Sequence, residues 1–215
     1  MQLTVVDYGR RLEEWLRALQ SEAEVPTSEQ FHVLRTVKER LLLEFRLEKE
    51  GSLRPKGHPV REVEEQPLLV FCHGSPGAGK SRVINWICRM FKEALGWKHE
   101  DEFLCVAFQN RVAQAMGGNT LHSGGDIDVG GQRKLEHTDI DILYTRNQYM
   151  RWVIIDELPM VADDLLGALE HQLTEASVEP RYKFRADKSA RFMGGYNLLA
   201  FGDFYQIPLF QQQLP

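Results

Sequence analysis

The chain has 215 residues, of which 43% are hydrophobic and 27% are charged, enough to bury the core of one domain, or of one domain with a small appendage. Its 31 acidic and 26 basic residues give a net charge of −5, which excludes a protein that binds nucleic acid through bulk positive charge. Any contact with nucleic acid must therefore use a local patch.

The three cysteines, Cys72, Cys88 and Cys105, are widely spaced and form no C-x-x-C pair, which argues against a disulfide framework and a structural zinc site. The first residues lack the apolar core of a signal peptide, and no apolar run approaches the roughly 20 residues needed to span a bilayer. We therefore expect an intracellular protein in a reducing compartment, with no membrane partner.

Residues 1–65 predict a helical segment that ends in a connecting loop. Asp7 is expected to cap a first helix, which ends before Pro26. The apolar face of that helix carries, at helical spacing, Tyr8, Leu12, Trp15, Leu16 and Leu19. A second amphipathic helix is predicted from Thr27 to a stop signal at Gly51, and the residues that follow form the loop.

Residues 66–215 predict an α/β domain, because short apolar runs alternate with amphipathic helical stretches, as in a parallel sheet covered by helices. The expected strands are residues 68–73, 102–108, 151–156 and 197–203. A helix between the first two strands, with Gly96 as its stop, has an apolar face of Val83, Ile87, Met90 and Ala94. Residues 117–131 and much of 177–195 are expected to be loops.

Residues 74–81, GSPGAGKS, fit the phosphate-binding pattern G-x-x-x-x-G-K-[ST] and lie between a predicted strand and a predicted helix. The glycines let the backbone turn tightly and aim its N–H groups at an anion, with help from the helix N-terminus. Lys80 would reach the β- and γ-phosphates, and the Ser81 hydroxyl would bind Mg²⁺; the alternative is a glycine-rich turn without a ligand. The predicted nucleotide-binding residues are Gly74, Ser75, Pro76, Gly77, Ala78, Gly79, Lys80, Ser81 and Arg82.

A phosphate loop of this kind needs a second carboxylate, at the end of a neighbouring strand, to organise the metal. Asp156 follows four apolar residues in WVIIDE, and it would hold Mg²⁺ directly or through water. Glu157 would act as general base toward the attacking water. An Asp-Glu pair at a strand end is often only solvated, but its combination with the phosphate loop favours a catalytic site.

The phosphate loop alone is shared by kinases, GTPases, ATPases and helicases. Four segments resemble, in order, motifs I, Ia, II and III of the Pif-type, RecD-like superfamily-one DNA helicases: GSPGAGKS (74–81), VAFQNRVAQAMGGNTLHS (106–123), VIIDELPMV (153–161) and GDFYQIP (202–208). Related helicase segments occur in Helitron-type transposons. The resemblance runs from about residue 27 to residue 208, and it implies a RecA-like domain that binds ATP, Mg²⁺ and single-stranded DNA.

The resemblance also implies roles for residues outside the phosphate loop. Gln206 is similar to the motif III glutamine that senses the γ-phosphate, and its alternative role is a loop amide bonded to backbone. Gln30 is similar to the glutamine that reads adenine, although Thr27 and Gln30 also form a capping-box pattern that would explain the glutamine structurally. Thr120 and His122 lie where the family contacts the DNA backbone, but a lone histidine is more often structural.

A basic and aromatic segment, RYKFRADKSAR (181–191), has a composition that suits single-stranded DNA, with cations for phosphates and rings for bases. Its candidate contacts are Arg181, Lys183 and Arg185. A solvated loop is the competing interpretation of this segment, and it is the favoured one.

The sequence departs from the family at Gln109 and Asn110, where Thr-Gly is usual, and at Pro159, where serine is usual. It also ends shortly after motif III, with no second RecA-like domain. Relatives bind ATP between two such domains, and the second supplies an arginine worth roughly 10³ to 10⁵ in rate. We therefore expect the first motor domain of a DNA helicase, present as a fragment or a truncated product.

Two other interpretations stay open. A non-catalytic ATP-dependent DNA-binding module, or a decayed transposon remnant, would fit the missing arginine but not the retained Glu157. A small-molecule kinase would fit the phosphate loop but not GDFYQIP, nor the lack of a recognisable lid. The resemblance further implies DNA duplex junctions as partners, a nuclear or else mitochondrial location, and roles in DNA repair, recombination and telomere maintenance.

Overall fold

The computed structural model describes residues 4–49, 66–107, 118–120, 149–177, 183–185 and 187–206. Its elements are, in chain order, α1 (Val5–Leu19), α2 (Ser28–Lys49), β1 (Leu69–His73), α3 (Lys80–Leu95), β2 (Phe103–Ala107), β3 (Asn119–Thr120), β4 (Trp152–Asp156), η1 (Leu158–Met160), α7 (Asp163–Ala176), η2 (Phe192–Gly195), β5 (Asn197–Gly202) and η3 (Phe204–Gln206), where η marks a short 3₁₀ turn. The predicted α/β class is confirmed.

The described strands form one parallel sheet in the order β1-β5-β4-β2-β3. Parallel pairing brings the carboxyl ends of the strands to one edge, because each connection must cross back to the opposite edge before the next strand starts. β5 lies between β1 and β4: Leu199 is opposite Val70 of β1 on one side and Ile154 of β4 on the other.

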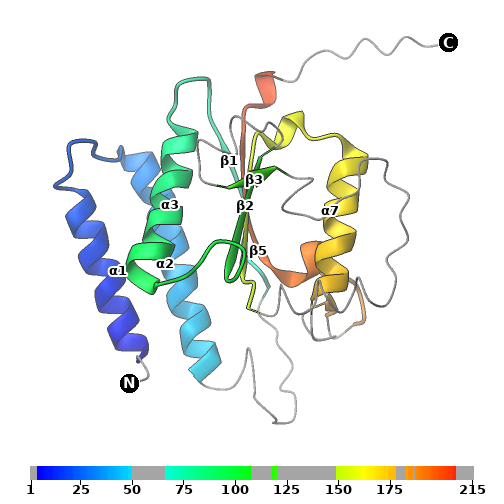
Figure 1. Ribbon diagram of the computed structural model, residues 1–215, viewed down its shortest axis with the longest axis horizontal. Helices are drawn as coiled ribbons and strands as arrows, with labels where there is room; N and C mark the ends of the chain where they lie inside the picture. Colours follow the sequence, from blue (N-terminus) through cyan, green and yellow to red (C-terminus); the bar gives the residue numbers. More distant parts are fainter. Residues whose placement is uncertain are drawn as a thin grey trace.

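Helices cover both faces of the sheet, with α1, α2 and α3 on one side and α7 on the other (Figure 1). Successive side chains of a strand point to opposite faces. In β4, Trp152 and Ile154 therefore enter the core beneath α3, whereas Val153 and Ile155 enter the core beneath α7. Every residue of β2, β4 and β5 is buried, as expected for strands covered on both faces.

The N-terminal helices share the core of the sheet. Leu12 of α1 and Leu34 of α2 are 0% exposed, and they belong to the same apolar cluster as Ile84 of α3 and Phe103 of β2. The two segments are thus held together by a common apolar core. The predicted boundary after residue 65 falls outside the described residues.

The start of α1 corrects one prediction, because Asp7 is not its cap. Thr4 is the N-cap, and its hydroxyl accepts a hydrogen bond from the Asp7 N–H at 3.2 Å. The Asp7 carboxylate in turn accepts the Thr4 N–H at 3.0 Å. This reciprocal capping box places Asp7 at the third helical position, so the helix begins earlier than predicted. Gly96 ends α3 as predicted, with its N–H bonded to the Lys92 carbonyl at 3.1 Å.

Two further elements differ from the sequence prediction. Asn119–Thr120 lie within the predicted loop at 117–131, yet they pair with β2 as β3; two polar residues show no apolar run that could reveal a strand. α7 has no counterpart among the predicted elements, although its Leu165, Leu169 and Leu173 recur at helical spacing and supply the signal.

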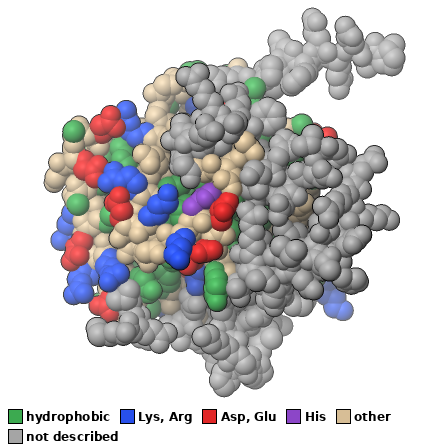
Figure 2. All heavy atoms as spheres, in the orientation of Figure 1, with side chains coloured by type: hydrophobic (Ala, Val, Ile, Leu, Met, Phe, Trp, Pro, Cys, Tyr) green, Lys and Arg blue, Asp and Glu red, His purple; other side chains and the backbone are tan. Residues whose placement is uncertain are grey.

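No helix in the described part of the chain is both long enough and apolar enough to cross a membrane. On the face shown in Figure 2, the coloured basic and acidic side chains are interspersed over the half of the molecule that carries α1, α2 and α3. That part of this face therefore presents no patch of a single sign.

The shared core predicts that Leu12→Ala lowers the free energy of unfolding by about 2–5 kcal/mol, because Leu12 is fully buried. Val6→Ala, on the same helix but with a side chain that is 79% exposed, is the matched control and should change it by less than about 0.5 kcal/mol. Urea unfolding followed by tryptophan fluorescence measures both variants. An unchanged midpoint for Leu12→Ala would contradict a shared core.

Candidate nucleotide-binding site

The predicted phosphate loop connects β1 to α3 at the carboxyl edge of the sheet. Gly77 and Gly79 both have a φ of +81°, a left-handed conformation that glycine adopts readily. A Cβ at position 79 would lie 2.5 Å from Nε2 of Gln30, so a side chain there would displace the end of that amide. The Ala78 N–H donates to the Ser75 carbonyl at 3.1 Å and closes the loop on itself.

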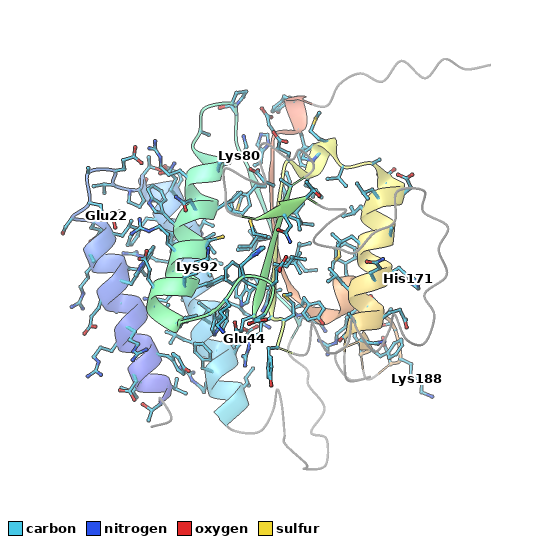
Figure 3. The ribbon with its side chains drawn as sticks, viewed as in Figure 1. Glu22, Glu44, Lys80, Lys92, His171 and Lys188 are labelled. Atoms are coloured by element: carbon cyan, nitrogen blue, oxygen red, sulfur yellow. The ribbon has the colours of Figure 1, made fainter. Side chains whose placement is uncertain are left out.

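Lys80 is the first residue of α3, at the upper end of the helix in Figure 3. Its Nζ donates to the carbonyl oxygen of Gly74 at 2.5 Å and to that of Ser75 at 3.2 Å. The ammonium therefore lies over the loop backbone. A bound phosphate would offer it a charged acceptor, and hydrogen bonds between charged groups are about twice as strong as neutral ones.

Ser81 and Asp156 meet although they come from different elements. The Ser81 hydroxyl donates to Oδ2 of Asp156 at 3.3 Å. The expectation that Asp156 follows a strand next to β1 is wrong, because β5 lies between β1 and β4; the start of α3 reaches across that strand instead. A hydroxyl and a carboxylate are the oxygen ligands that Mg²⁺ prefers, so the two residues fit the predicted metal.

The two carboxylates have the electrostatic surroundings of a reactive site. Burial raises the pKa of Asp156, while the N–H of Glu157, the hydroxyl of Ser81 and the charge of Lys80 oppose the rise. Burial, followed by the charge of Asp156, raises the pKa of Glu157, and Lys80 again opposes it. Oε2 of Glu157 is buried and has no hydrogen-bond partner among the described residues. A buried, unpartnered carboxylate oxygen beside a phosphate loop suits a general base.

Gln30 performs two structural tasks with one side chain. Its Oε1 accepts the Thr27 N–H at 3.0 Å, and the Thr27 hydroxyl accepts the Gln30 N–H at 3.4 Å, which confirms the predicted capping box at the start of α2. Its Nε2 donates to the Ala78 carbonyl at 3.0 Å, within the phosphate loop. The residue thus contacts the loop while it caps the helix, and its role in reading adenine stays a prediction.

Two further predicted ligands lie near the loop. Nε of Arg82 pairs with Oε2 of Glu24 at 3.1 Å, and both side chains are exposed. Gln206 is the last residue of η3, which begins two residues after the end of β5. The backbone of Gln206 therefore follows the carboxyl edge of the sheet. The side chain of Gln206 lies outside what the structure describes, so its contact with the γ-phosphate stays a prediction.

The candidate DNA contacts are dispersed over the fold. Thr120 lies opposite Ala107, the last residue of β2, and so belongs to the carboxyl edge. Lys183 donates to the Glu175 carbonyl at 3.2 Å. The guanidinium of Arg185 donates hydrogen bonds to the side chains of Gln66 and Ser189 and to the Ala190 carbonyl.

Figure 3 places Lys188, in the same basic segment, far from Lys80. Lys188 is thus not brought beside the phosphate loop. His122, Arg181 and the motif Ia residues Gln109 and Asn110 lie outside the described residues.

Two site residues, Gly202 and Asp203, are absent from the predicted set. The Gly202 carbonyl accepts the Gly74 N–H at 3.2 Å and so ties the phosphate loop to the end of β5. Asp203 is buried, and its Oδ1 accepts the Tyr205 N–H at 3.0 Å, which holds the start of η3. Both residues belong to the GDFYQIP string, whose polar and glycine positions directly after an apolar strand are the signal that could have found them.

The two tasks of Gln30 can be separated by substitution. Gln30→Glu keeps an oxygen for the Thr27 N–H but cannot donate to Ala78, so nucleotide affinity should fall while stability holds. Thr27→Ala is the complementary variant: it removes the cap, which contributes about 1 kcal/mol, and leaves the contact with Ala78. Unfolding and ATP-binding titrations check both variants. Parallel losses of stability and affinity in both variants would show that capping is the only task.

Comparison with known proteins identifies the family. A family model described as "AAA domain" matches residues 60–211. The ATP-dependent DNA helicase RRM3 of Saccharomyces cerevisiae is 31% identical over 154 residues, which are 69% of this chain and 19% of that protein. The ATP-dependent DNA helicase Pif1 of Bdellovibrio bacteriovorus is 32% identical over 166 residues, or 70% of this chain and 34% of that protein.

Solved structures share the fold. Unliganded Pif1 from Bacteroides sp. matches with a TM-score of 0.54 and 19% identity, over 88% of this chain and 34% of that one. The Pif1 helicase from Candida albicans matches with a TM-score of 0.53 and 25% identity, over 85% of this chain and 33% of that one. The chain spans only 19% and 34% of the length of the two curated relatives named above. It belongs to the AAA-domain family, as a RecA-like domain of the Pif-type helicases.

Proposed function

We propose that this chain is the ATP-binding motor domain of a Pif-type DNA helicase. In the complete enzyme it would couple ATP hydrolysis to translocation along single-stranded DNA and to unwinding of the duplex. The observation that carries the proposal is the meeting of the phosphate loop with Asp156 and Glu157 at one sheet edge. Homology to proteins named ATP-dependent DNA helicases supports the choice of nucleotide and substrate.

The side chains of the site divide the work of phosphoryl transfer. Lys80 would neutralise charge on the β- and γ-phosphates from its place over the loop. Ser81 and Asp156 would hold Mg²⁺, which when bound supplies Lewis-acid stabilisation of the transferred group. Glu157 would take the proton of the attacking water on its unpartnered Oε2. Gln30 would orient the nucleotide from the loop side.

The substrates and the cellular setting of the proposal follow from the family resemblance. Single-stranded DNA and duplex junctions are the proposed partners, together with a second RecA-like domain that supplies the catalytic arginine. The proposed location is the nucleus, with the mitochondrion as second choice, and the proposed processes are DNA repair, recombination and telomere maintenance.

Lys80→Ala should weaken MgATP binding by at least about tenfold, because a hydrogen bond to a charged group contributes about 1.5–3 kcal/mol. Lys92→Ala is the matched control, since it removes the same charge from an exposed position of the same helix. Titration with a fluorescent ATP analogue measures both affinities. Equal binding by the unsubstituted chain and Lys80→Ala would refute the phosphate-site assignment.

The 215-residue chain alone should bind single-stranded DNA weakly, hydrolyse ATP slowly and unwind no duplex. Stepping requires two domains that close and open around ATP while they hold DNA in alternation, and this sequence carries one set of motifs I to III. DNA binding should also weaken as salt rises, because phosphate contacts release counterions.

Strand displacement on a tailed duplex, run beside an ATPase assay with and without single-stranded DNA, tests these expectations. Robust unwinding by the monomer would contradict the two-domain requirement. ATP binding without turnover would favour the non-catalytic module. Turnover that ignores DNA and passes phosphate to a small molecule would favour the kinase.

A further inference from the structure

The turn η1, which follows β4, packs closely against the end of β5. Pro159, in η1, lies so close to Gly202 that a Cβ at position 202 would collide with Cδ of the proline and lie 2.8 Å from its Cγ. The ring is rigid and cannot swing aside as a long side chain could. Glycine at position 202 therefore makes the space into which η1 packs.

Glu157 enters this turn in an unusual conformation. Its φ of 55° and ψ of 37° lie in the left-handed region, which residues other than glycine rarely occupy. The Met160 N–H donates to the Glu157 carbonyl at 2.8 Å, and the Val161 N–H donates to the Leu158 carbonyl at 3.0 Å. Such a conformation persists only where the surroundings hold it. The turn is held by the contact of Pro159 with Gly202 of β5 and by Leu158, which packs against the apolar cluster beneath α7.

Gly202 also touches the phosphate loop. Its carbonyl accepts the Gly74 N–H at 3.2 Å, and it lies opposite His73, the last residue of β1. Because β5 runs between β1 and β4, this one residue contacts the phosphate loop on one side and η1 on the other.

We propose that Pro159 is a positioning residue for ATP hydrolysis: docked on Gly202, its ring holds the left-handed turn at Glu157 and so fixes the carboxylate relative to the phosphate loop. The proposal rests on the proposed function, because it takes Glu157 as the general base. The resemblance described above implies serine at this position in the family, whereas this chain has Pro159, whose ring makes the contact with Gly202.

The ring has a local effect on the backbone besides its packing. All three residues of η1 are partly buried, so the contact of the Pro159 ring with Gly202 contributes to packing as well. The side chain is thus placed to constrain the backbone at Glu157 and to pack η1 against β5.

The test compares Pro159→Ala, Gly202→Ala and the double variant with the unsubstituted chain. Pro159→Ala should lower kcat by about 10- to 100-fold, the cost of a misplacement of about 1 Å, with the MgATP dissociation constant within about twofold, because the phosphate loop is intact. In a Glu157→Gln background the same substitution should cause no further loss, because it acts through that carboxylate.

Gly202→Ala should lower both stability and kcat, since its methyl group displaces the ring. The double variant should regain the stability, because the smaller side chain at 159 frees the space, but it should keep a low kcat. Gly167→Ala in α7 is the control: a Cβ there meets nothing within 4 Å, and kcat should not change.

A measurement independent of turnover completes the test. Hydrogen exchange of the Met160 amide, which is bonded to the Glu157 carbonyl, should accelerate at least about tenfold in Pro159→Ala as the turn loosens. Unchanged exchange of the Met160 amide overturns the proposal, as does a normal kcat in Pro159→Ala. The proposal is also overturned if Pro159→Ala lowers kcat as much in the Glu157→Gln background as in the unsubstituted chain. If the unsubstituted chain neither binds nor hydrolyses MgATP, the proposed function fails instead, while the exchange result still decides whether Pro159 holds the turn.

Discussion

Parallel strand pairing brings the chemistry of this chain to one edge of one sheet. β1 leads into the phosphate loop, β4 ends at Asp156, directly before Glu157, and β5 ends at Gly202, directly before Asp203. If β4 ran the other way, its carboxylates would end at the opposite edge, roughly 16 Å away for a strand of this length. The hydrogen bond between Ser81 and Asp156 could then not form. The site therefore depends on the direction of the strands before it depends on any single side chain.

Two glycines at this edge, Gly79 and Gly202, leave space for neighbouring groups of the site. Gly79 leaves room for the amide of Gln30, which ties α2 to the phosphate loop, and Gly202 leaves room for Pro159, which ties η1 to β5. In both places a larger residue would push away the group that orients a ligand or a catalytic carboxylate. At both positions a neighbouring side chain thus fills the space left by glycine, and the buried strands β4 and β5 lie directly below.

Much of this arrangement could be predicted from local sequence, and the rest depends on contacts between distant residues. The strands β1, β2, β4 and β5 could be predicted because each is a short apolar run. The phosphate loop could be predicted because its glycines and Lys80 keep a fixed spacing. The sheet order could not be predicted, so Asp156 was expected beside β1 although β5 intervenes. β3 has only two polar residues and no periodicity. The contact of Gln30 with Ala78 joins residues 48 positions apart, which no local pattern reveals.

The central claim is that Asp156 holds the metal of a bound nucleotide while Glu157, its neighbour, serves only hydrolysis. Calorimetric titration of ATP with and without Mg²⁺, on Asp156→Asn and Glu157→Gln, tests it most directly when hydrolysis is followed in parallel. The account predicts that Asp156→Asn loses the Mg²⁺-dependent part of the affinity and keeps Mg²⁺-free binding. Glu157→Gln should bind MgATP as the unsubstituted chain does and lose hydrolysis by about 10²- to 10⁴-fold. An equal loss of MgATP affinity in both variants, or full hydrolysis by Glu157→Gln, would contradict it.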